Sequence, residues 1–210
     1  MVKTVIFDFD MTLVNSIYAI TKGLNQMAEH FSLPRVTEDD TRKVMSLPSS
    51  EFWSALWGEH NPAWSEYFLA AVKGDEKHYL EIVPGAVELL AGLKNNGTAL
   101  GLATNRDDAW AALSSVDLAR FFDAAVGAGD VEKPKPHPDM VLKVMHQVGA
   151  DPGQTILIGD AVYDVQAANA AGIKAIAVLE GGVPRTELLA AGAWQLVDTL
   201  KDAGDILNRL

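Results

Sequence analysis

The sequence contains no cysteine, few basic residues relative to acidic ones, and no long hydrophobic run. The absence of cysteine excludes disulfides, thiolate nucleophiles and cysteine-based zinc sites. With 17 Lys and Arg against 28 Asp and Glu, the formal net charge is −11, which argues against nucleic acid and anionic membrane surfaces as partners. A membrane-spanning helix needs about 18 or more consecutive apolar residues, and no secretory signal pattern precedes the first strand-like segment. We therefore expect a cytoplasmic, soluble monomer or homodimer with no nucleic-acid or membrane partner.

Several motifs of well-known enzyme classes are also missing. There is no Gly-x-x-x-x-Gly-Lys-Ser/Thr loop, which a P-loop nucleotidase requires. Gly127-Ala128-Gly129 lacks the third glycine of a dinucleotide-binding fingerprint. No Gly-x-Ser-x-Gly elbow occurs, and the five histidines have no metal-ligand spacing. The chemistry must therefore come from other side chains.

The pattern of apolar runs predicts an α/β fold. Short apolar segments typical of buried parallel strands occupy residues 4–10, 98–105, 124–130, 155–160, 175–180 and, more weakly, 194–197. Helical patterns lie between them, at residues 84–95, 107–116, 138–148, 162–171 and 184–191. Alternation of strands and helices predicts a doubly wound, Rossmann-like parallel sheet.

One interval departs from this alternation. Residues 16–81 contain no convincing strand and are too long for a simple crossover connection. They show helical patterns at 17–31, 38–44, 50–57 and 63–79. We therefore predict an all-helical cap over residues 16–81, inserted after the first strand of an α/β core made of residues 1–15 and 82–210. The aromatic residues of the cap are interpreted as its small core, or alternatively as a wall over a substrate; they are Phe52, Trp53, Trp57, Trp64, Tyr67 and Phe68.

Two acidic residues, Asp8 and Asp10, stand at the end of the first apolar run. Residues i and i+2 of a strand face the same side. A buried, unpaired charge is too costly to be part of a core, although a single Asp often only caps a helix or forms a turn. Two such residues followed by Thr12 indicate a site that binds a cation, performs a reaction, or both.

Polar residues follow the other predicted strands as well, and the carboxyl ends of parallel strands form one edge of the sheet. They are Thr104 and Asn105 after the second strand, Lys133 and Lys135 after the third, and Asp160 and Asp164 after the fourth. Asp oxygens are ligands that Mg²⁺ prefers. A carboxylate can attack phosphorus and form an aspartyl-phosphate, and a second can transfer the proton. Thr104 and a lysine can stabilise the charge on the phosphoryl oxygens.

Four segments, in order, carry a resemblance to a known family. They are Asp8-Phe9-Asp10-Met11-Thr12, Thr104-Asn105, Lys135-Pro136-His137-Pro138-Asp139 and Gly159-Asp160-Ala161-Val162-Tyr163-Asp164. With these motifs the chain resembles the haloacid dehalogenase superfamily over nearly its full length. It is most similar there to phosphatases with a helical cap that resemble phosphoglycolate phosphatase.

The resemblance implies a role for each matching residue. Asp8 would be the nucleophile and Asp10 the general acid and base. The Asp8 side chain, the Asp10 backbone carbonyl and Asp160 would hold Mg²⁺, with support from Asp164. Thr104 and Asn105 would hold the phosphoryl group, and Lys135 would stabilise the nucleophile and the phosphoryl charge. The resemblance thus implies a Mg²⁺-dependent phosphatase acting on a small-molecule phosphate ester.

Some positions depart from the pattern or leave a choice open. Met11 stands where the family usually has Gly, and so narrows the entrance or shifts the chain. The cap loop at residues 44–48 is also atypical. Lys133 also fits the Lys-Pro-x-Pro pattern, but we favour Lys135 for the site and expect Lys133 to be a solvated loop residue. Arg42, Lys43 and Arg106 are expected to be surface charges, or else to bind a substrate carboxylate.

Two other functions compete with the phosphatase hypothesis. A sugar phosphomutase similar to β-phosphoglucomutase shares the pattern, including the second Asp. A non-catalytic binding protein that retains the fold is the other alternative. The intact set of carboxylates argues against it, because clustered negative charge is costly without a metal.

Overall fold

The first strand of the chain lies at the centre of a six-stranded sheet in the computed structural model, which describes residues 2–45, 47, 49–75 and 78–210. β1 (Thr4–Phe7) pairs with β4 (Ala99–Ala103) on one side and with β6 (Thr155–Gly159) on the other. Its residues Val5, Ile6 and Phe7 are fully buried, as expected for a strand covered on both faces. The order is β5-β4-β1-β6-β7-β8, completed by β5 (Ala124–Val126), β7 (Lys174–Val178) and β8 (Gln195–Val197). All of these pairings are parallel, which confirms the predicted doubly wound sheet.

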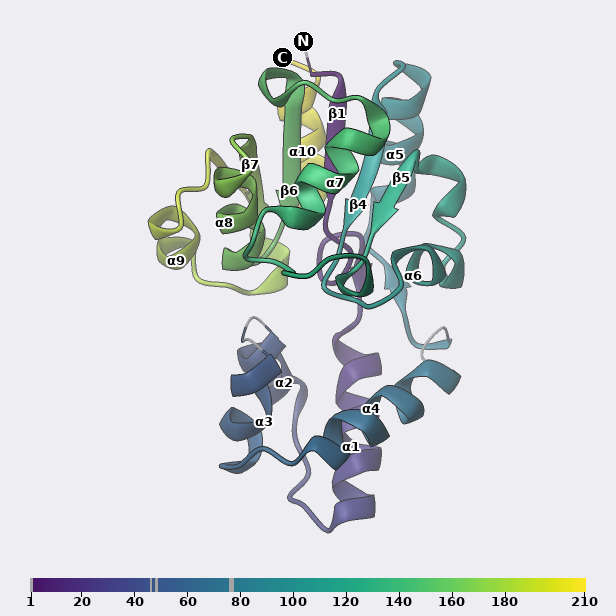
Figure 1. The fold of residues 1–210 in the computed structure, drawn as a ribbon, viewed down its shortest axis with the longest axis vertical. Coiled ribbons are helices and arrows are strands. Elements are labelled where there is room, and N and C mark those ends of the chain that lie inside the picture. The colour runs from purple at the N-terminus through teal and green to yellow at the C-terminus, as the bar shows by residue number, and fades with distance from the viewer. Residues whose placement is uncertain (1, 46, 48, 76–77) are drawn as a thin grey trace. The chain divides into compact units, whose positions relative to one another are not determined.

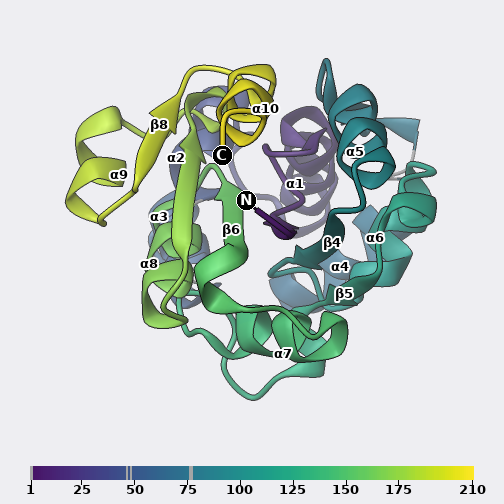
Figure 2. The same ribbon diagram turned by 90° about the horizontal axis from the view of Figure 1, so that it is seen from above.

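Helices cover both faces of this sheet (Figure 2). One face is covered by α7 (Asp139–Val148) and α8 (Val162–Ala170), and the other by α5 (Ala86–Asn95) and α10 (Leu200–Leu207). α6 (Ala109–Ser115) packs beside β5, and α9 (Arg185–Ala190) beside β8. The core between the sheet and α7 and α8 is made of small and branched residues, including Ile6, Val126, Val144, Leu157 and Val165. This packing fixes the sheet edge at which the polar residues lie.

Several strands are shorter than predicted because the chain leaves the sheet before the end of the apolar run from which the strand was predicted. The segment predicted at residues 4–10 leaves the sheet after Phe7. The predicted ends of the third and fifth strands are instead the 3₁₀ turns η3 (Ala128–Asp130) and η5 (Leu179–Gly181). Two further 3₁₀ turns, η2 (Ala119–Phe121) and η4 (Pro152–Gln154), occur in loops. The strands run in the same direction (Figure 1), so η3 and η5, which follow β5 and β7, lie at the carboxyl edge of the sheet, whereas η2 and η4 precede β5 and β6.

The chain divides into two compact units. One comprises Met1–Val14 and Ile82–Leu210 and contains the parallel sheet; the other comprises Asn15–Glu81. The described part of the second unit consists of α1 (Ile17–Phe31), α2 (Glu38–Met45), α3 (Ser49–Trp57) and α4 (Pro62–Asp75). Two-residue strands, β2 (Val14–Asn15) and β3 (Glu81–Ile82), pair where the chain passes from one unit to the other.

Aromatic side chains form the core of the helical unit. Trp53 and Trp64 are buried together with Leu24, Met27 and Val36, and Phe52, Trp57, Tyr67 and Phe68 pack against this cluster. The rings of Trp53 and Trp57, one turn apart on α3, stack with their centroids 6.1 Å apart. This agrees with the interpretation of these residues as a core, because such ring contacts contribute beyond area burial.

Two predicted features reach residues that the structure does not describe. The predicted helix at 63–79 includes residues 76 and 77, and the atypical loop at 44–48 includes residues 46 and 48; both pairs lie outside the described residues. Within the described part of the chain, α10 was not predicted. In that same part, no helix is both long and apolar enough to cross a bilayer.

A glycine in β4 allows α7 to approach the sheet. A Cβ on Gly101 would overlap the side chain of Val144 on α7. We expect Gly101→Ala to lower the free energy of unfolding by about 1–3 kcal/mol, the usual cost of overpacking a core. Gly92→Ala on the exposed side of α5 is the matched control, since no atom lies within 4 Å of the added methyl group. It should raise stability by up to about 1 kcal/mol. Denaturant unfolding of both variants measures this; equal stability would contradict close packing at Gly101.

Candidate active site

A buried ammonium group joins two carboxylates at the carboxyl edge of the sheet. Lys135 Nζ donates to Asp8 Oδ1 and to Asp164 Oδ1, both at 2.6 Å. Asp8 directly follows β1, Lys135 lies in the loop between η3 and α7, and Asp164 lies in the first turn of α8. All three residues are buried, with Lys135 only 6% exposed. Burial of a charge requires a partner, and here each of the three has one.

A fourth acidic residue completes a carboxylate cluster. Asp160 follows β6, and its Oδ1 accepts a hydrogen bond from the buried Thr12 hydroxyl at 3.1 Å. One carboxylate oxygen each from Asp8, Asp160 and Asp164 can be chosen so that all lie within 4.8 Å of one another. Three hard oxygen donors at this spacing are a suitable set for a divalent cation.

Burial and neighbouring charges shift the pKa values of the residues in this cluster. Burial raises the pKa of Asp8 to about 7; Asp164 and Asp10 add to the rise and Lys135 opposes it. Burial, together with Asp8 and Asp164, also raises the pKa of Asp160 well above its ordinary value. Burial lowers the pKa of Lys135, but Asp164 and Asp8 outweigh this and raise it overall. If all three acids ionise, one lysine leaves two negative charges in excess, so the donor set fits a divalent cation in charge as well as in chemistry.

The Thr104-Asn105 pair follows β4 and borders this cluster through Lys135. The Thr104 N–H donates to the carbonyl of Val126 at 3.1 Å, so of the Thr104 donors the side-chain hydroxyl is the one available to a phosphoryl oxygen. Thr104 Oγ1 accepts the N–H of Arg106 at 3.2 Å, so its own hydroxyl hydrogen points elsewhere and can be donated. Asn105 is exposed, and its Nδ2 donates to the backbone carbonyl of Lys135 at 3.3 Å.

Asp10 lies apart from the carboxylate cluster and pairs with a different cation. Its carboxylate accepts two hydrogen bonds from the guanidinium of Arg106, at 2.8 and 2.7 Å. The expectation that Asp8 and Asp10 share one side of a strand does not hold, because β1 ends at Phe7 and the chain then turns. Arg106 is likewise half-buried and bonded to Asp10, not a plain surface charge. The sequence contained Arg106 next to Thr104-Asn105, but nothing in it indicated the partner.

Met11 adopts a backbone conformation that favours glycine. Its φ is +57°, in the left-handed region, which costs a residue with a Cβ roughly 1 kcal/mol or more. The turn is nevertheless formed, since Met11 N–H donates to the carbonyl of Val14 at 2.7 Å, and the Met11 side chain is buried. With Met11 in place of the usual Gly, the loop therefore still forms its hydrogen-bonded turn to Val14.

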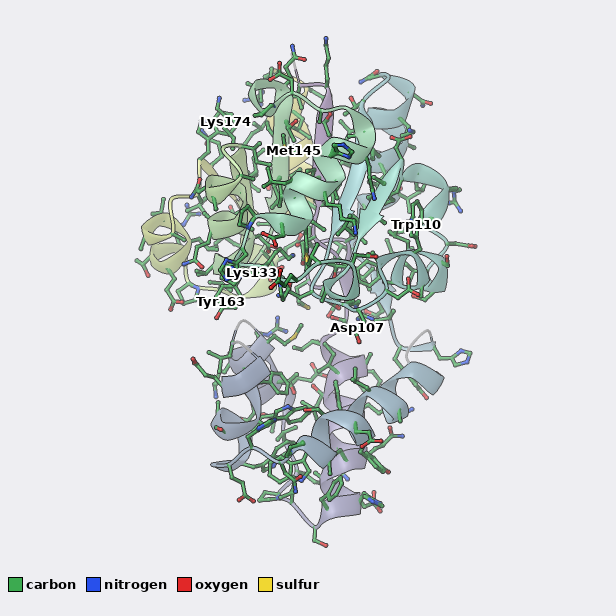
Figure 3. All side chains as sticks on the ribbon, in the orientation of Figure 1. Asp107, Trp110, Lys133, Met145, Tyr163 and Lys174 are labelled. Carbon is green, nitrogen blue, oxygen red and sulfur yellow. The ribbon has the colours of Figure 1, made fainter. Side chains whose placement is uncertain are left out.

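Lys133 and Lys135 have different surroundings. Lys133 is exposed, at the edge of the α/β unit where Tyr163 and Asp107 also lie (Figure 3), whereas Lys135 is buried against Asp8 and Asp164. Of the two lysines that fit the sequence pattern, only Lys135 is within reach of the carboxylate cluster in the described structure.

Two glycines to which the sequence reasoning gave no role leave room for the carboxylates. A Cβ on Gly181, at the end of η5, would overlap the carboxylate of Asp160, and a Cβ on Gly159 would overlap that of Asp164. Asp164 is also fixed by the N–H of Ala161, which donates to its Oδ2 at 3.0 Å. Gly159 stands in a recognised motif, but Gly181 lies 22 residues after Gly159, and only the fold brings it to the site.

The fold and the site together define an α/β enzyme with acidic and lysine side chains at the carboxyl edge of a parallel sheet. Residues 5–178 match the model of the haloacid dehalogenase-like hydrolase family. The chain therefore belongs to the haloacid dehalogenase-like hydrolases, as the sequence motifs predicted.

Comparisons with individual proteins agree with this assignment. "Probable phosphatase IndB" of Dickeya dadantii is 33% identical over 209 residues, which cover 94% of this chain and 90% of that protein. "Phosphoglycolate phosphatase 1" of Pseudomonas aeruginosa is 28% identical over 212 residues, 95% of this chain and 78% of that protein. A haloacid dehalogenase-like family hydrolase of known structure from Streptococcus pneumoniae superposes with a TM-score of 0.85 at 21% identity, covering 98% of each chain. The prediction of an enzyme of the phosphatase type within this family is confirmed.

Removal of metal should make the stability of the protein depend on pH. The pKa of Asp8 is about 7 in the folded protein and 3.8 ordinarily, so the folded state binds the proton more tightly than the unfolded chain. The contribution of Asp8 to stability is then fully present below pH 3.8 and is lost as the pH rises to about 7, by up to about 1.4 kcal/mol per pH unit. Thermal unfolding in EDTA between pH 4.5 and 8 measures the fall. Mg²⁺ should restore stability increasingly at higher pH, and Asp8→Asn should reduce the slope. The same dependence of the melting temperature on pH in wild type and in Asp8→Asn would contradict the raised pKa of Asp8.

Gly181 should control cation affinity through Asp160. We expect Gly181→Ala to displace the Asp160 carboxylate and to weaken Mg²⁺ binding by about 10-fold or more, as changes behind a metal ligand do. Titration of Mg²⁺ against the melting temperature measures the affinity, with Gly92→Ala as the control glycine substitution. Unchanged affinity in Gly181→Ala would show that Asp160 does not bind the ion or that the loop after β7 yields freely.

Proposed function

We propose that this protein is a Mg²⁺-dependent phosphatase that hydrolyses a small-molecule phosphate monoester through an aspartyl-phosphate on Asp8. The observation that carries this proposal is the bridge from Lys135 to Asp8 and Asp164, next to Asp160 at the carboxyl edge of the sheet. The family and the names of the relatives support the reaction class, and the contact of Lys135 with Asp8 supports Asp8 as the nucleophile.

Asp8 is the proposed nucleophile. One carboxylate oxygen of Asp8 attacks phosphorus, the bond from phosphorus to the ester oxygen breaks, and an aspartyl-phosphate forms. The Lys135 ammonium holds Oδ1 of Asp8 at 2.6 Å, which orients the nucleophile. It also places a positive charge beside the phosphoryl oxygens, where charge is concentrated during transfer.

Asp10 is the proposed proton carrier. It gives a proton to the departing ester oxygen in the first step. In the second step it takes a proton from the water that attacks the phosphorus of the aspartyl-phosphate. The bond between phosphorus and the Asp8 oxygen then breaks, which restores the Asp8 carboxylate and releases phosphate. Asp10 lies two residues from Asp8 but outside the carboxylate cluster, which suits a group that exchanges protons and does not ligate the cation through its side chain.

The remaining residues would bind the phosphoryl group and the cation. The Thr104 hydroxyl is the donor available to a phosphoryl oxygen, and Asn105 links the loop after β4 to the lysine loop through its bond to the Lys135 carbonyl. Asp8, Asp160 and the Asp10 carbonyl would hold Mg²⁺, supported by Asp164. The ion would supply charge neutralisation for the phosphoryl group.

The relatives guide the choice of substrate. Several of them are named phosphoglycolate phosphatases, so 2-phosphoglycolate is the first ester to test, followed by other small phosphate esters.

Activity measurements test the nucleophile and the lysine assignment together. With Mg²⁺ the protein should release phosphate from p-nitrophenyl phosphate and from at least one metabolite ester, and EDTA should abolish the release. Asp8→Asn should reduce turnover to the background without enzyme, and Asp10→Asn should reduce it by about 10²–10⁴-fold. Lys135→Met should lose most activity, whereas the neighbouring exposed Lys133→Met should retain it.

Other outcomes would redirect the proposal. Full activity in Asp8→Asn would reject the nucleophile, and equal losses in Lys133→Met and Lys135→Met would reject the distinction between the two lysines. Conversion of a sugar phosphate to its positional isomer without net release of phosphate would identify a phosphomutase instead.

A further inference from the structure

Arg106, in the loop after β4, donates two hydrogen bonds to the carboxylate of Asp10. Its Nε donates to Asp10 Oδ2 at 2.8 Å, and its Nη2 donates to Asp10 Oδ1 at 2.7 Å. Two parallel N–H···O bonds from one planar guanidinium fix both the position and the plane of a carboxylate, which a single bond does not. Arg106 therefore constrains both oxygens of the Asp10 carboxylate in this structure.

Arg106 is itself held firmly. Its guanidinium lies over the ring of the fully buried Phe9, 4.9 Å from the ring centre. Its backbone N–H donates to Thr104 Oγ1 at 3.2 Å, and its carbonyl accepts from Ala128 N–H at 2.8 Å. This carbonyl passes so close to Gly127 that a Cβ there would collide with it. The guanidinium is thus presented from a fixed loop, unlike that of a flexible surface arginine.

We propose that Arg106 is a positioning residue that orients the Asp10 carboxylate for proton transfer. The proposal rests on the proposed function, in which Asp10 carries the proton. A carboxylate has about four lone-pair positions. The guanidinium bonds to one lone pair on each oxygen and thereby sets the plane in which the other lone pairs lie. Correct placement matters, because a displacement of about 1 Å at a reacting group can cost about 100-fold in rate.

A double-mutant cycle tests whether Arg106 acts through Asp10. Wild type, Arg106→Gln, Asp10→Ala and the double variant are compared by kcat and kcat/KM on one alkyl phosphate. We expect Arg106→Gln to lower kcat/KM by about 10–100-fold in the wild-type background, as loss of proton-transfer catalysis does. In the Asp10→Ala background the same substitution should change it by less than about 2-fold, because residues that act through one another are not additive. An equal loss in both backgrounds would overturn the proposal.

Arg106→Lys separates orientation from charge. Lysine keeps the positive charge but cannot form the two parallel hydrogen bonds that the planar guanidinium makes. Arg106→Lys should therefore be impaired to within about 3-fold of Arg106→Gln. Recovery of wild-type activity by lysine would show that charge alone is sufficient and would overturn a role in orientation.

The leaving group separates positioning of Asp10 from direct substrate binding. The loss in kcat/KM, which reports the first step, should be small for Arg106→Gln on p-nitrophenyl phosphate, whose leaving group departs without a proton, and should increase toward alkyl phosphates. A uniform loss would indicate binding of the phosphoryl group, and a rise in KM confined to carboxylate-bearing esters would indicate binding of that carboxylate; both overturn the proposal. The trend is independent of partial unfolding, which lowers activity on all esters by the same factor.

Controls distinguish this proposal from the proposed function. Arg120→Gln removes another arginine that lies over a ring, 4.7 Å from the centre of Phe121, and should leave every rate unchanged. Failure of the wild-type protein to hydrolyse any phosphate ester would reject the proposed function. A normal wild-type enzyme with an unaffected Arg106→Gln variant would reject the positioning role alone.

Discussion

The bridge from the Lys135 ammonium to Asp8 and Asp164 is the interaction on which the rest of the site depends. Three buried carboxylates within a few ångströms of one another repel strongly, and the lysine offsets part of that repulsion. It also joins segments that are distant in the sequence: the end of β1, the loop before α7 and the first turn of α8. A buried charge without such a partner would cost several kcal/mol. The three segments must therefore meet for the fold to tolerate the buried charges that they carry.

The two acidic residues after β1 pair with two different basic side chains. Asp8 belongs to the lysine bridge and the carboxylate cluster, whereas Asp10 is held by the guanidinium of Arg106. The two roles of the proposed reaction, bonding to phosphorus and moving a proton, thus fall on side chains with separate surroundings. Close packing maintains the separation: Gly159 and Gly181 leave room for Asp164 and Asp160, and Thr12 bonds to Asp160.

Much of the fold was predictable, and the errors have physical causes. Continuous apolar runs identified the six strands, because a sheet covered on both faces needs them. The first strand was predicted too long because its polar end leaves the sheet and turns. α10 was missed although Thr199 and Asp202 form a capping box at its start and Leu200, Ala203 and Leu207 are buried. The two-residue strands β2 and β3 are too short to produce a pattern in a single sequence.

The sequence by itself determined the family, the parallel sheet and the identity of the chemical groups, because apolar periodicity and motif residues are local properties of the chain. Tertiary structure decided which groups meet. The contact of Lys135 with both Asp8 and Asp164, the pairing of Arg106 with Asp10 and the need for glycine at position 181 depend on distances between segments far apart in sequence. Such distances are set by the packing of helices on the sheet, since an interior packed at crystal density allows only one arrangement of these side chains.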